Sequence, residues 1–176
     1  MTSRRALITG ASSGIGTAAA LELAAEGLAL WLTYAGREAE AARIADECRA
    51  AGSPDVRVSR LDLRDPESID ALTAEITDAW GDLHVLVNNG GVCPYTPYPD
   101  IDIEEWDGVL ETNARGTFLL TRASLPLLRA ADGDRSIVNI ASIAGQVGAL
   151  QTGIHYAASK GALLAITRSF ARQDRK

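Results

Sequence analysis

The stretch that decides the fold reads Thr9-Gly10-Ala11-Ser12-Ser13-Gly14-Ile15-Gly16. It follows a short apolar run, residues 6–8, and precedes an alanine- and leucine-rich segment of helical period. Glycines between a strand and a helix allow tight turning and close backbone approach, and the helix N-terminus offers free N–H groups and partial positive charge. These features suit the pyrophosphate of a dinucleotide, although a glycine-rich turn without a ligand is the alternative. The residues expected to contact the cofactor in this loop are Gly10, Ser12, Ser13, Gly14, Ile15 and Gly16.

Outward from this loop, short apolar runs alternate with longer segments of helical period. That alternation is typical of repeated βαβ units, so we expect an α/β fold with a Rossmann-type, doubly wound parallel sheet. The expected strands are residues 6–9, 28–34, 56–61, 85–88 and 136–140. The expected helices are residues 15–26, 37–51, 66–80, 103–129 and 154–172. Without a linker or an internal repeat, residues 1–176 are expected to form one domain.

Composition excludes several classes of protein. The chain has 176 residues and a net charge of −6, which gives no electrostatic reason to expect nucleic acid or an anionic membrane as a partner. No run approaches the roughly 18 apolar residues of a membrane span. Cys48 and Cys93 make neither a metal-ligand spacing nor a disulfide framework. We therefore expect no metal, two free thiols and a reducing, cytoplasmic setting.

The three-residue gap between the first two glycines of the loop differs from the common G-x-G-x-x-G pattern and resembles the short-chain dehydrogenase/reductase family. Two further motifs add to the resemblance. Asp62 and Leu63 follow the third expected strand, where the family places an Asp-Leu pair beside the adenine. After the fourth strand the sequence reads Asn88-Asn89-Gly90-Gly91, where the family has Asn-Asn-Ala-Gly. We expect the asparagines to tie neighbouring strands together, and Asn89, Gly90 and Gly91 to contact the cofactor, with a larger side chain at position 90 crowding it.

The resemblance also implies an active site made of Asn113, Ser142, Tyr156 and Lys160. Tyr156 and Lys160 are four residues apart, which places both on one helical face. A free tyrosine has a pKa near ~10, and a neighbouring ammonium favours the phenolate, so Lys160 is expected to lower the pKa of Tyr156. The family resemblance gives Tyr156 the role of general acid and base, and Lys160 also the nicotinamide ribose. It gives Ser142 the substrate oxygen and Asn113 a water that links Lys160 to solvent.

The end of the second expected strand bears on the choice of dinucleotide. Relatives that prefer NAD usually end this strand with an acidic residue, whereas this chain has Tyr34 and, shortly after it, Arg37. Arg37 opens a helix and is suited to a 2′-phosphate. Ser13 stands where many NADP-binding relatives have a basic residue, and Glu38 neighbours Arg37. NADP(H) is therefore favoured over NAD(H), with an unengaged surface arginine as the alternative.

The resemblance ends near Arg172, whereas the family continues with a sixth and a seventh strand and a substrate-binding flap. We expect either a fragment of a longer enzyme or a naturally short relative that lacks these C-terminal strands. Family members pair through the segments that correspond to residues 103–129 and 154–172, which implies a homodimer or homotetramer. His155 is expected to point away from Tyr156 and to serve packing or lie on the surface.

Two functions are compatible with these observations. The first is an oxidoreductase that transfers a hydride between NADP(H) or NAD(H) and a small-molecule carbonyl or secondary alcohol, similar to 3-oxoacyl-acyl-carrier-protein reductases. The second is a catalytically silent dinucleotide-binding or scaffolding relative. Sugar-nucleotide epimerases of the longer branch also use Tyr-x-x-x-Lys, but the spacing of Gly10, Gly14 and Gly16 argues against them.

Overall fold

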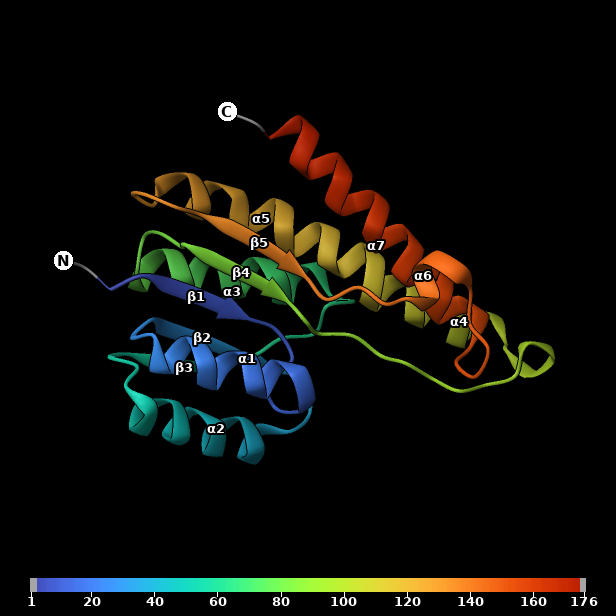
Figure 1. The fold of residues 1–176 in the computed structure, drawn as a ribbon, viewed down its shortest axis with the longest axis horizontal. Helices are drawn as coiled ribbons and strands as arrows, with labels where there is room; N and C mark the ends of the chain where they lie inside the picture. The colour runs from blue at the N-terminus through green and yellow to red at the C-terminus, as the bar shows by residue number, and fades with distance from the viewer. Residues whose placement is uncertain (1–2, 175–176) are drawn as a thin grey trace.

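The computed structural model describes residues 3–174, and at its centre lies a sheet of five parallel strands in the order β3-β2-β1-β4-β5 (Figure 1). From β1 the sheet extends through β2 to β3 on one side, and from the neighbouring β4 to β5 on the other. Such a reversal opens a crevice at the carboxyl ends of β1 and β4, where α/β proteins bind their ligands. The strands are β1 (Arg5–Ile8), β2 (Ala29–Tyr34), β3 (Val56–Arg60), β4 (Val85–Asn88) and β5 (Ser136–Asn139).

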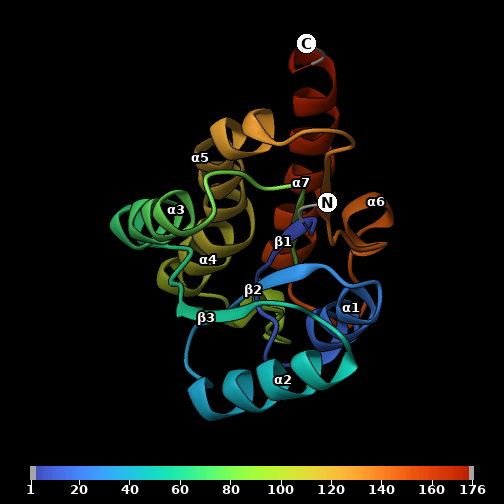
Figure 2. The ribbon, with the colours of Figure 1, turned by 90° about the vertical axis from the view of Figure 1, so that its left-hand side faces the viewer.

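Helices connect successive strands and cover both faces of the sheet (Figure 2). On one face lie α1 and α2, which contact each other, and on the other lie α3 and α5. The long C-terminal α7 packs against α4, η2 and α6. The helices are α1 (Gly14–Ala25), α2 (Glu38–Ala51), α3 (Pro66–Ala79), η1 (Tyr98–Asp100), α4 (Ile103–Leu110), η2 (Glu111–Gly116), α5 (Thr117–Ala130), α6 (Ala144–Val147) and α7 (Ile154–Gln173).

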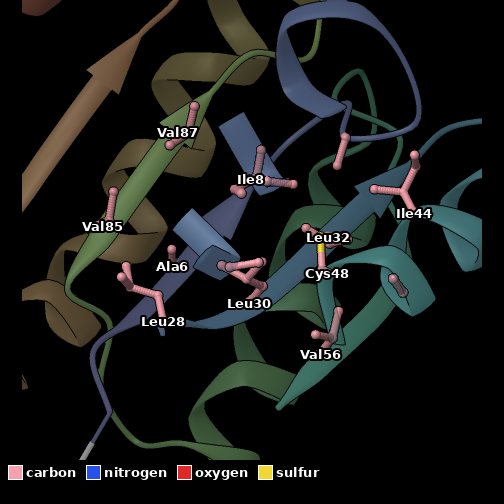
Figure 3. Packing of buried hydrophobic residues seen from close by; sticks show 14 residues of the cluster. Ala6, Ile8, Leu28, Leu30, Leu32, Ile44, Cys48, Val56, Val85 and Val87 are labelled. Atoms are coloured by element: carbon pink, nitrogen blue, oxygen red, sulfur yellow. The ribbon is translucent and has the colours of Figure 1, made fainter. Parts of the chain in front are cut away.

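Each face of the sheet has its own hydrophobic core, because successive side chains of a strand point to opposite faces. In β1, Ala6 and Ile8 pack toward α1 and α2, while Leu7 packs toward α3 and α5. Figure 3 shows the first core, in which Leu30 and Leu32 of β2 meet Ile44 of α2. Burial on both faces explains why the central strands are continuous apolar runs. The cores hold the carboxyl ends of the strands in a fixed arrangement beneath the site.

The expected Rossmann-type parallel sheet is confirmed, and the expected bounds of strands and helices agree with the structure to within about two residues. The interior of the expected helix 103–129 differs, because α4 passes into a π-helical turn, η2, before α5 begins. Gly116 ends that turn, and a Cβ there would collide with the carbonyl of Leu63. The short helices η1 and α6 were not expected, since segments of three or four residues have no recognisable periodicity.

Candidate active site

The glycine loop between β1 and α1 needs its three glycines for two different reasons. Gly10 and Gly14 have φ angles of 63° and 56°, a left-handed conformation that favours glycine. Gly16 has no such angle, but a Cβ on it would collide with the carbonyl oxygen of Gly10 and with the side chain of Asn89. The last glycine therefore allows α1 to pack closely beneath the loop.

The N-terminus of α1 is arranged to accept an anion. Ser13 occupies the N-cap position, yet its side chain makes no capping hydrogen bond, and the first turn contains no acidic residue. The backbone N–H groups of this turn and the positive end of the helix dipole are thus available to a ligand. A phosphate or pyrophosphate group fits this end of the helix.

Asn89 and Thr9 lock the loops after β4 and β1 together. The side-chain amide of Asn89 donates to the carbonyl oxygens of Thr9 and Gly10, at 3.0 Å each. The Thr9 hydroxyl oxygen accepts hydrogen bonds from the backbone N–H groups of Asn89 and Gly90. In the neighbouring pair of strands, Asn88 donates to the Asn139 carboxamide oxygen at 2.8 Å. These carboxamides connect neighbouring strands as expected.

The structure places protein side chains next to Gly90, where the sequence led us to expect the cofactor. A Cβ on this residue would lie 3.0 Å from Leu63 Cδ1 and 3.1 Å from Thr9 Oγ1. Crowding at position 90 thus affects the protein's own side chains first. An alanine would fit only if these neighbours moved by a few tenths of an ångström.

A cleft of about 1090 Å³ opens at the carboxyl ends of β1 and β4. It gathers most of the cofactor-binding residues expected from the sequence, from the glycine loop through the end of β2 to the loop after β4. Of that expected set, only Gly16, Tyr156 and Lys160 do not line it, because Gly16 packs beneath the loop and the other two lie beyond Cys93. The expected residues that line the cleft are Gly10, Ser12, Ser13, Gly14, Ile15, Tyr34, Arg37, Asp62, Leu63, Asn89, Gly90 and Gly91.

Two arginines stand at the β2 and β3 end of this cleft. Arg37 was expected there, whereas Arg60 was missed although it pairs in register with Tyr34. Among residues 3–174, neither arginine forms an ion pair, and Arg60 donates only to the carbonyl of Ala35, at 3.3 Å. Arg64, which also lines the cleft, is paired with Asp62. The cleft therefore has two arginines beside Tyr34 that are not in contact with a carboxylate, although Arg37 and Arg60 lower the pKa values of Glu40 and Asp62 from farther away.

Asp62 stabilises the turn after β3 and also lines the cleft. Its carboxylate accepts a hydrogen bond from the backbone N–H of Arg64 at 2.9 Å. This backbone hydrogen bond, together with the Arg64 side chain, holds the pKa of Asp62 below its usual value. The carboxylate remains ionised and able to accept a further hydrogen bond from a ligand.

Tyr156 and Lys160 lie on one face of α7, facing the end of β5. The ammonium of Lys160 lies 5.7 Å from the centre of the Tyr156 ring. It donates to the carbonyl of Ile140 at 2.6 Å, which fixes it at the end of β5. Ser142, which follows the same strand, lies close enough to the Tyr156 phenol to lower its pKa. The structure thus brings Ser142, Tyr156 and Lys160 together.

The pKa of Tyr156 contradicts the expectation that Lys160 lowers it. Burial raises the pKa above its ordinary value of 10.0, and the interaction with Ser142 offsets only part of that rise. Burial also lowers the pKa of Lys160. Both groups are shifted toward their neutral forms, because the pocket removes water from each. The phenol of this structure is therefore protonated at neutral pH.

Asn113 lies in the π-helical turn and is almost completely buried (1% exposed). Its amide oxygen accepts from the backbone N–H of Val92 at 2.8 Å, and its amide nitrogen donates to the Val92 carbonyl at 2.8 Å and to the Ser159 hydroxyl at 3.0 Å. The side chain fastens the loop after β4 to η2 and α7. Its expected role in holding a water stays a prediction.

Cys93 is, after Arg60, a second residue of this site that sequence reasoning missed. The thiol, expected to be an ordinary free cysteine, is free and exposed. It lies near both Tyr156 and Lys160 and contributes to raising the pKa of each. Because it also lines the cleft, Cys93 connects the cofactor side of the site to the catalytic residues. Only its position shortly after Asn88–Gly91 indicated such a place.

The described part of the chain lacks two features that would favour another activity: a cluster of metal ligands and a membrane-spanning helix. Residues 3–174 contain no group of three or more histidine, cysteine or acidic side chains that could hold a metal ion. None of the helices in this range is long and apolar enough to cross a membrane.

Comparison with known proteins gives a consistent result. Residues 4–176 match the family model described as short chain dehydrogenase. The 3-oxoacyl-[acyl-carrier-protein] reductase FabG of Staphylococcus aureus is 34% identical over 171 residues, which are 97% of this chain and 68% of the relative. The corresponding reductase of a Synechocystis species is 33% identical over 173 residues, covering 98% of this chain and 69% of the relative.

Solved structures agree with the sequence comparison. A metagenomic short-chain oxidoreductase in complex with NADP superimposes with a TM-score of 0.89 at 34% identity, over 98% of this chain and 76% of that one. A short-chain alcohol dehydrogenase from Sinorhizobium meliloti gives a TM-score of 0.88 at 34% identity, over 98% and 67% of the two chains.

Proposed function

The chain belongs to the short-chain dehydrogenase family of NAD(P)-dependent oxidoreductases, and we propose that it reduces a small-molecule carbonyl compound, or oxidises the corresponding secondary alcohol, with NADP(H). The observation that carries this proposal is the grouping of Tyr156 with Lys160 and Ser142, next to Cys93 at the end of a dinucleotide-sized cleft. The similar FabG reductases and the NADP-bound oxidoreductase support the same class of reaction.

The residues of the cleft fit a nicotinamide dinucleotide. The volume suits a ligand of that size, and the uncapped N-terminus of α1 suits its pyrophosphate. Asp62 and Leu63 would hold the adenine, and Asn89, Gly90 and Gly91 would line the path toward the nicotinamide. Lys160 would hold the nicotinamide ribose. When bound, the nicotinamide ring supplies or accepts the hydride.

NADP(H) is favoured by the charges around Tyr34. Arg37 and Arg60 line the cleft and have no carboxylate partner among the described residues, so both can pair with a 2′-phosphate. Glu38, the neighbour of Arg37, lies near the Tyr34 phenol and contributes to raising its pKa. Either arginine can therefore pair with a phosphate without first breaking an ion pair with a carboxylate.

The side chains have distinct tasks in the reduction. Tyr156 donates its phenolic proton to the carbonyl oxygen as negative charge develops there. Ser142 hydrogen-bonds the same oxygen and orients it. Lys160 is assigned the stabilisation of the phenolate that remains, an effect of the nearby ammonium that burial of Tyr156 outweighs in the free protein. Asn113 maintains the arrangement of the loop after β4 and is the proposed site for the water that returns the proton.

The test is NADPH oxidation with ketones and 3-oxoacyl thioesters as substrates. We expect turnover by the wild type and a loss of about 10²- to 10⁴-fold in Tyr156→Phe, since general acid catalysis contributes that much. NADPH binding, measured by fluorescence, should be unchanged in this variant. If the wild type turns over no faster than Tyr156→Phe while both bind NADPH, the chain is instead a silent dinucleotide-binding relative.

The pH dependence provides a second check on the role of Tyr156. Reduction needs the protonated phenol, and burial raises the pKa of Tyr156 above 10.0 in the free protein. Wild type minus Tyr156→Phe difference absorbance of tyrosinate should therefore show no ionisation of Tyr156 through neutral pH. Ionisation should begin only as the pH rises toward and beyond 10. A midpoint below the ordinary value would contradict the environment described for this residue.

A further inference from the structure

The first turn of α7 contains a buried histidine that the proposed chemistry does not use. His155 immediately precedes Tyr156 and is completely buried (0% exposed), so of the two expected places, packing or surface, it takes the first. Its Nε2 lies 3.1 Å from Oε1 of Glu105 on α4. No partner for its Nδ1 is found among residues 3–174. A buried N–H without an acceptor is costly, so the favoured tautomer has its proton on Nε2 and donates it to Glu105.

Gly153 and Trp106 restrict the position of the His155 ring. A Cβ on Gly153 would collide with the imidazole, so the ring occupies space that only glycine leaves free. The indole of Trp106 lies nearly parallel to the imidazole, at 19° and with 6.3 Å between ring centres. The direction of the Nε2–H bond toward Glu105 is therefore set by packing as well as by the hydrogen bond.

Glu105 extends this contact to the loop after β4. Its Oε1 also accepts a hydrogen bond from the Thr96 hydroxyl at 2.6 Å. Two residues earlier in the loop, the carbonyl of Pro94 accepts from the backbone N–H of Gly153 at 3.0 Å. One carboxylate thus joins three segments: the loop, the first turn of α4 and the first turn of α7.

The joined segments are those that carry the reacting groups. The loop contains Cys93 and Tyr95, both of which lie close enough to the Tyr156 phenol to raise its pKa. His155 shares the backbone of Tyr156. A shift of the loop relative to α7 would change the distance between the Tyr156 hydroxyl and the end of the cleft. Errors of about 1 Å in such positions can cost about 100-fold in rate.

We propose that His155 and Glu105 are positioning residues for the reduction, and that their contact, with Thr96, holds Tyr156 and the loop around Cys93 at the distance at which the phenol reaches the carbonyl oxygen. The inference rests on the proposed function, because that function makes Tyr156 the proton donor. Neither residue donates a proton to the substrate in this scheme. Both act through the placement of Tyr156.

Three variants and one control test the proposal by steady-state kinetics. His155→Phe keeps a ring against Trp106 but cannot donate, Glu105→Ala removes the acceptor, and Glu105→Gln keeps an acceptor oxygen. Asp107→Ala removes one charge from the exposed side of α4 and is the matched control. We expect kcat to fall about 10- to 100-fold in the first two variants, with the Kd of NADPH within about twofold of wild type. Glu105→Gln should recover most of kcat.

A second measurement does not depend on turnover. Tyrosinate difference absorbance, referenced to Tyr156→Phe in each background, reports the environment of Tyr156 directly. Burial is the main cause of its raised pKa, so loosening the first turn of α7 should move the midpoint down toward the ordinary value in Glu105→Ala. The midpoint should stay unchanged in Asp107→Ala.

The outcomes separate the two proposals. Wild type that binds no NADPH or shows no turnover contradicts the proposed function, while the tyrosinate titration still decides whether His155 and Glu105 position Tyr156. Kinetics and titration of His155→Phe and Glu105→Ala that match Asp107→Ala would overturn the positioning role. If these variants do not fold, Thr96→Val and Glu105→Gln replace them. A parallel loss of NADPH affinity and unfolding midpoint in both makes the contact purely structural.

Discussion

At the scale of single residues, the choice of dinucleotide depends on which charges surround Tyr34. Arg64 forms an ion pair with Asp62, whereas Arg37 and Arg60 line the cleft and form no ion pair among the described residues. Arg37 was recognisable from its place after β2. Arg60 was not, because its relation to Tyr34 arises from the register of two strands 26 positions apart in the chain.

Arg37→Gln and Arg60→Gln should each weaken NADPH binding about tenfold, because a hydrogen bond to a charged group is worth about 1.5 kcal/mol or more. The Kd of NADH should change little, since NADH has no 2′-phosphate. Nicotinamide fluorescence titrations measure both constants. Arg168→Gln, which removes an exposed arginine from α7, is the matched control. Equal weakening of NADPH and NADH would contradict a contact to the phosphate.

At the scale of elements, the π-helical turn η2 interrupts the long amphipathic segment 103–129 and places Asn113 in the candidate active site. The expected helix 103–129 has the right ends, but an unbroken α-helix would not give the arrangement that directs Asn113 to Val92 and Ser159. π-turns of this kind are rare and frequently lie at functional sites. Local sequence does not predict them, because the turn is stabilised by contacts with the loop after β4 and with α7.

Asn113→Ala should lower the free energy of unfolding by about 1–3 kcal/mol, because the backbone groups of Val92 and the hydroxyl of Ser159 lose a buried partner. Urea denaturation measures this change. Thr112→Ala, which removes a hydroxyl bonded only to the preceding turn, should cost about 0.5 kcal/mol. A loss in Asn113→Ala no larger than in Thr112→Ala would show that the loop is held by other contacts.

At the scale of the whole molecule, apolar side chains are exposed on the segments through which we predict pairing, residues 103–129 and 154–172. Phe118 of α5 is 39% exposed and lies 6.0 Å from the ring of Phe170 on α7. Ile103 and Ile154, at the starts of α4 and α7, are more exposed still. Grouped apolar surface of this kind favours association. A homodimer or homotetramer that pairs through the segments 103–129 and 154–172 remains our prediction for the protein in solution.

Phe118→Glu should shift the protein from dimer toward monomer, because a charge at the centre of an apolar interface must be desolvated on association. Sedimentation velocity over a range of concentrations measures the change. Leu150→Glu adds the same charge at a fully exposed leucine outside both segments and should leave the assembly unchanged. A monomeric wild type, or dimers that survive Phe118→Glu, would exclude pairing through this face.

The sequence by itself determined the parallel sheet, the bounds of its main helices and strands, the dinucleotide-type loop and the family. It could do so because these features depend on local patterns, such as Gly10, Gly14 and Gly16 between a strand and a helix, or alternating apolar runs. Tyr156 and Lys160 were placed on one face for the same reason, since the helical repeat alone brings them together.

Only the tertiary structure decided the pKa of Tyr156, the π-helical turn around Asn113, the cleft position of Arg60 and the contact between His155 and Glu105. Each depends on atoms from segments that are distant in the chain. Burial of Tyr156 outweighed the expected effect of its helical neighbour, because removal of water is a property of the assembled pocket. The glycine loop therefore indicated a dinucleotide, whereas packing around the loop after β4 set how Tyr156 would meet a substrate.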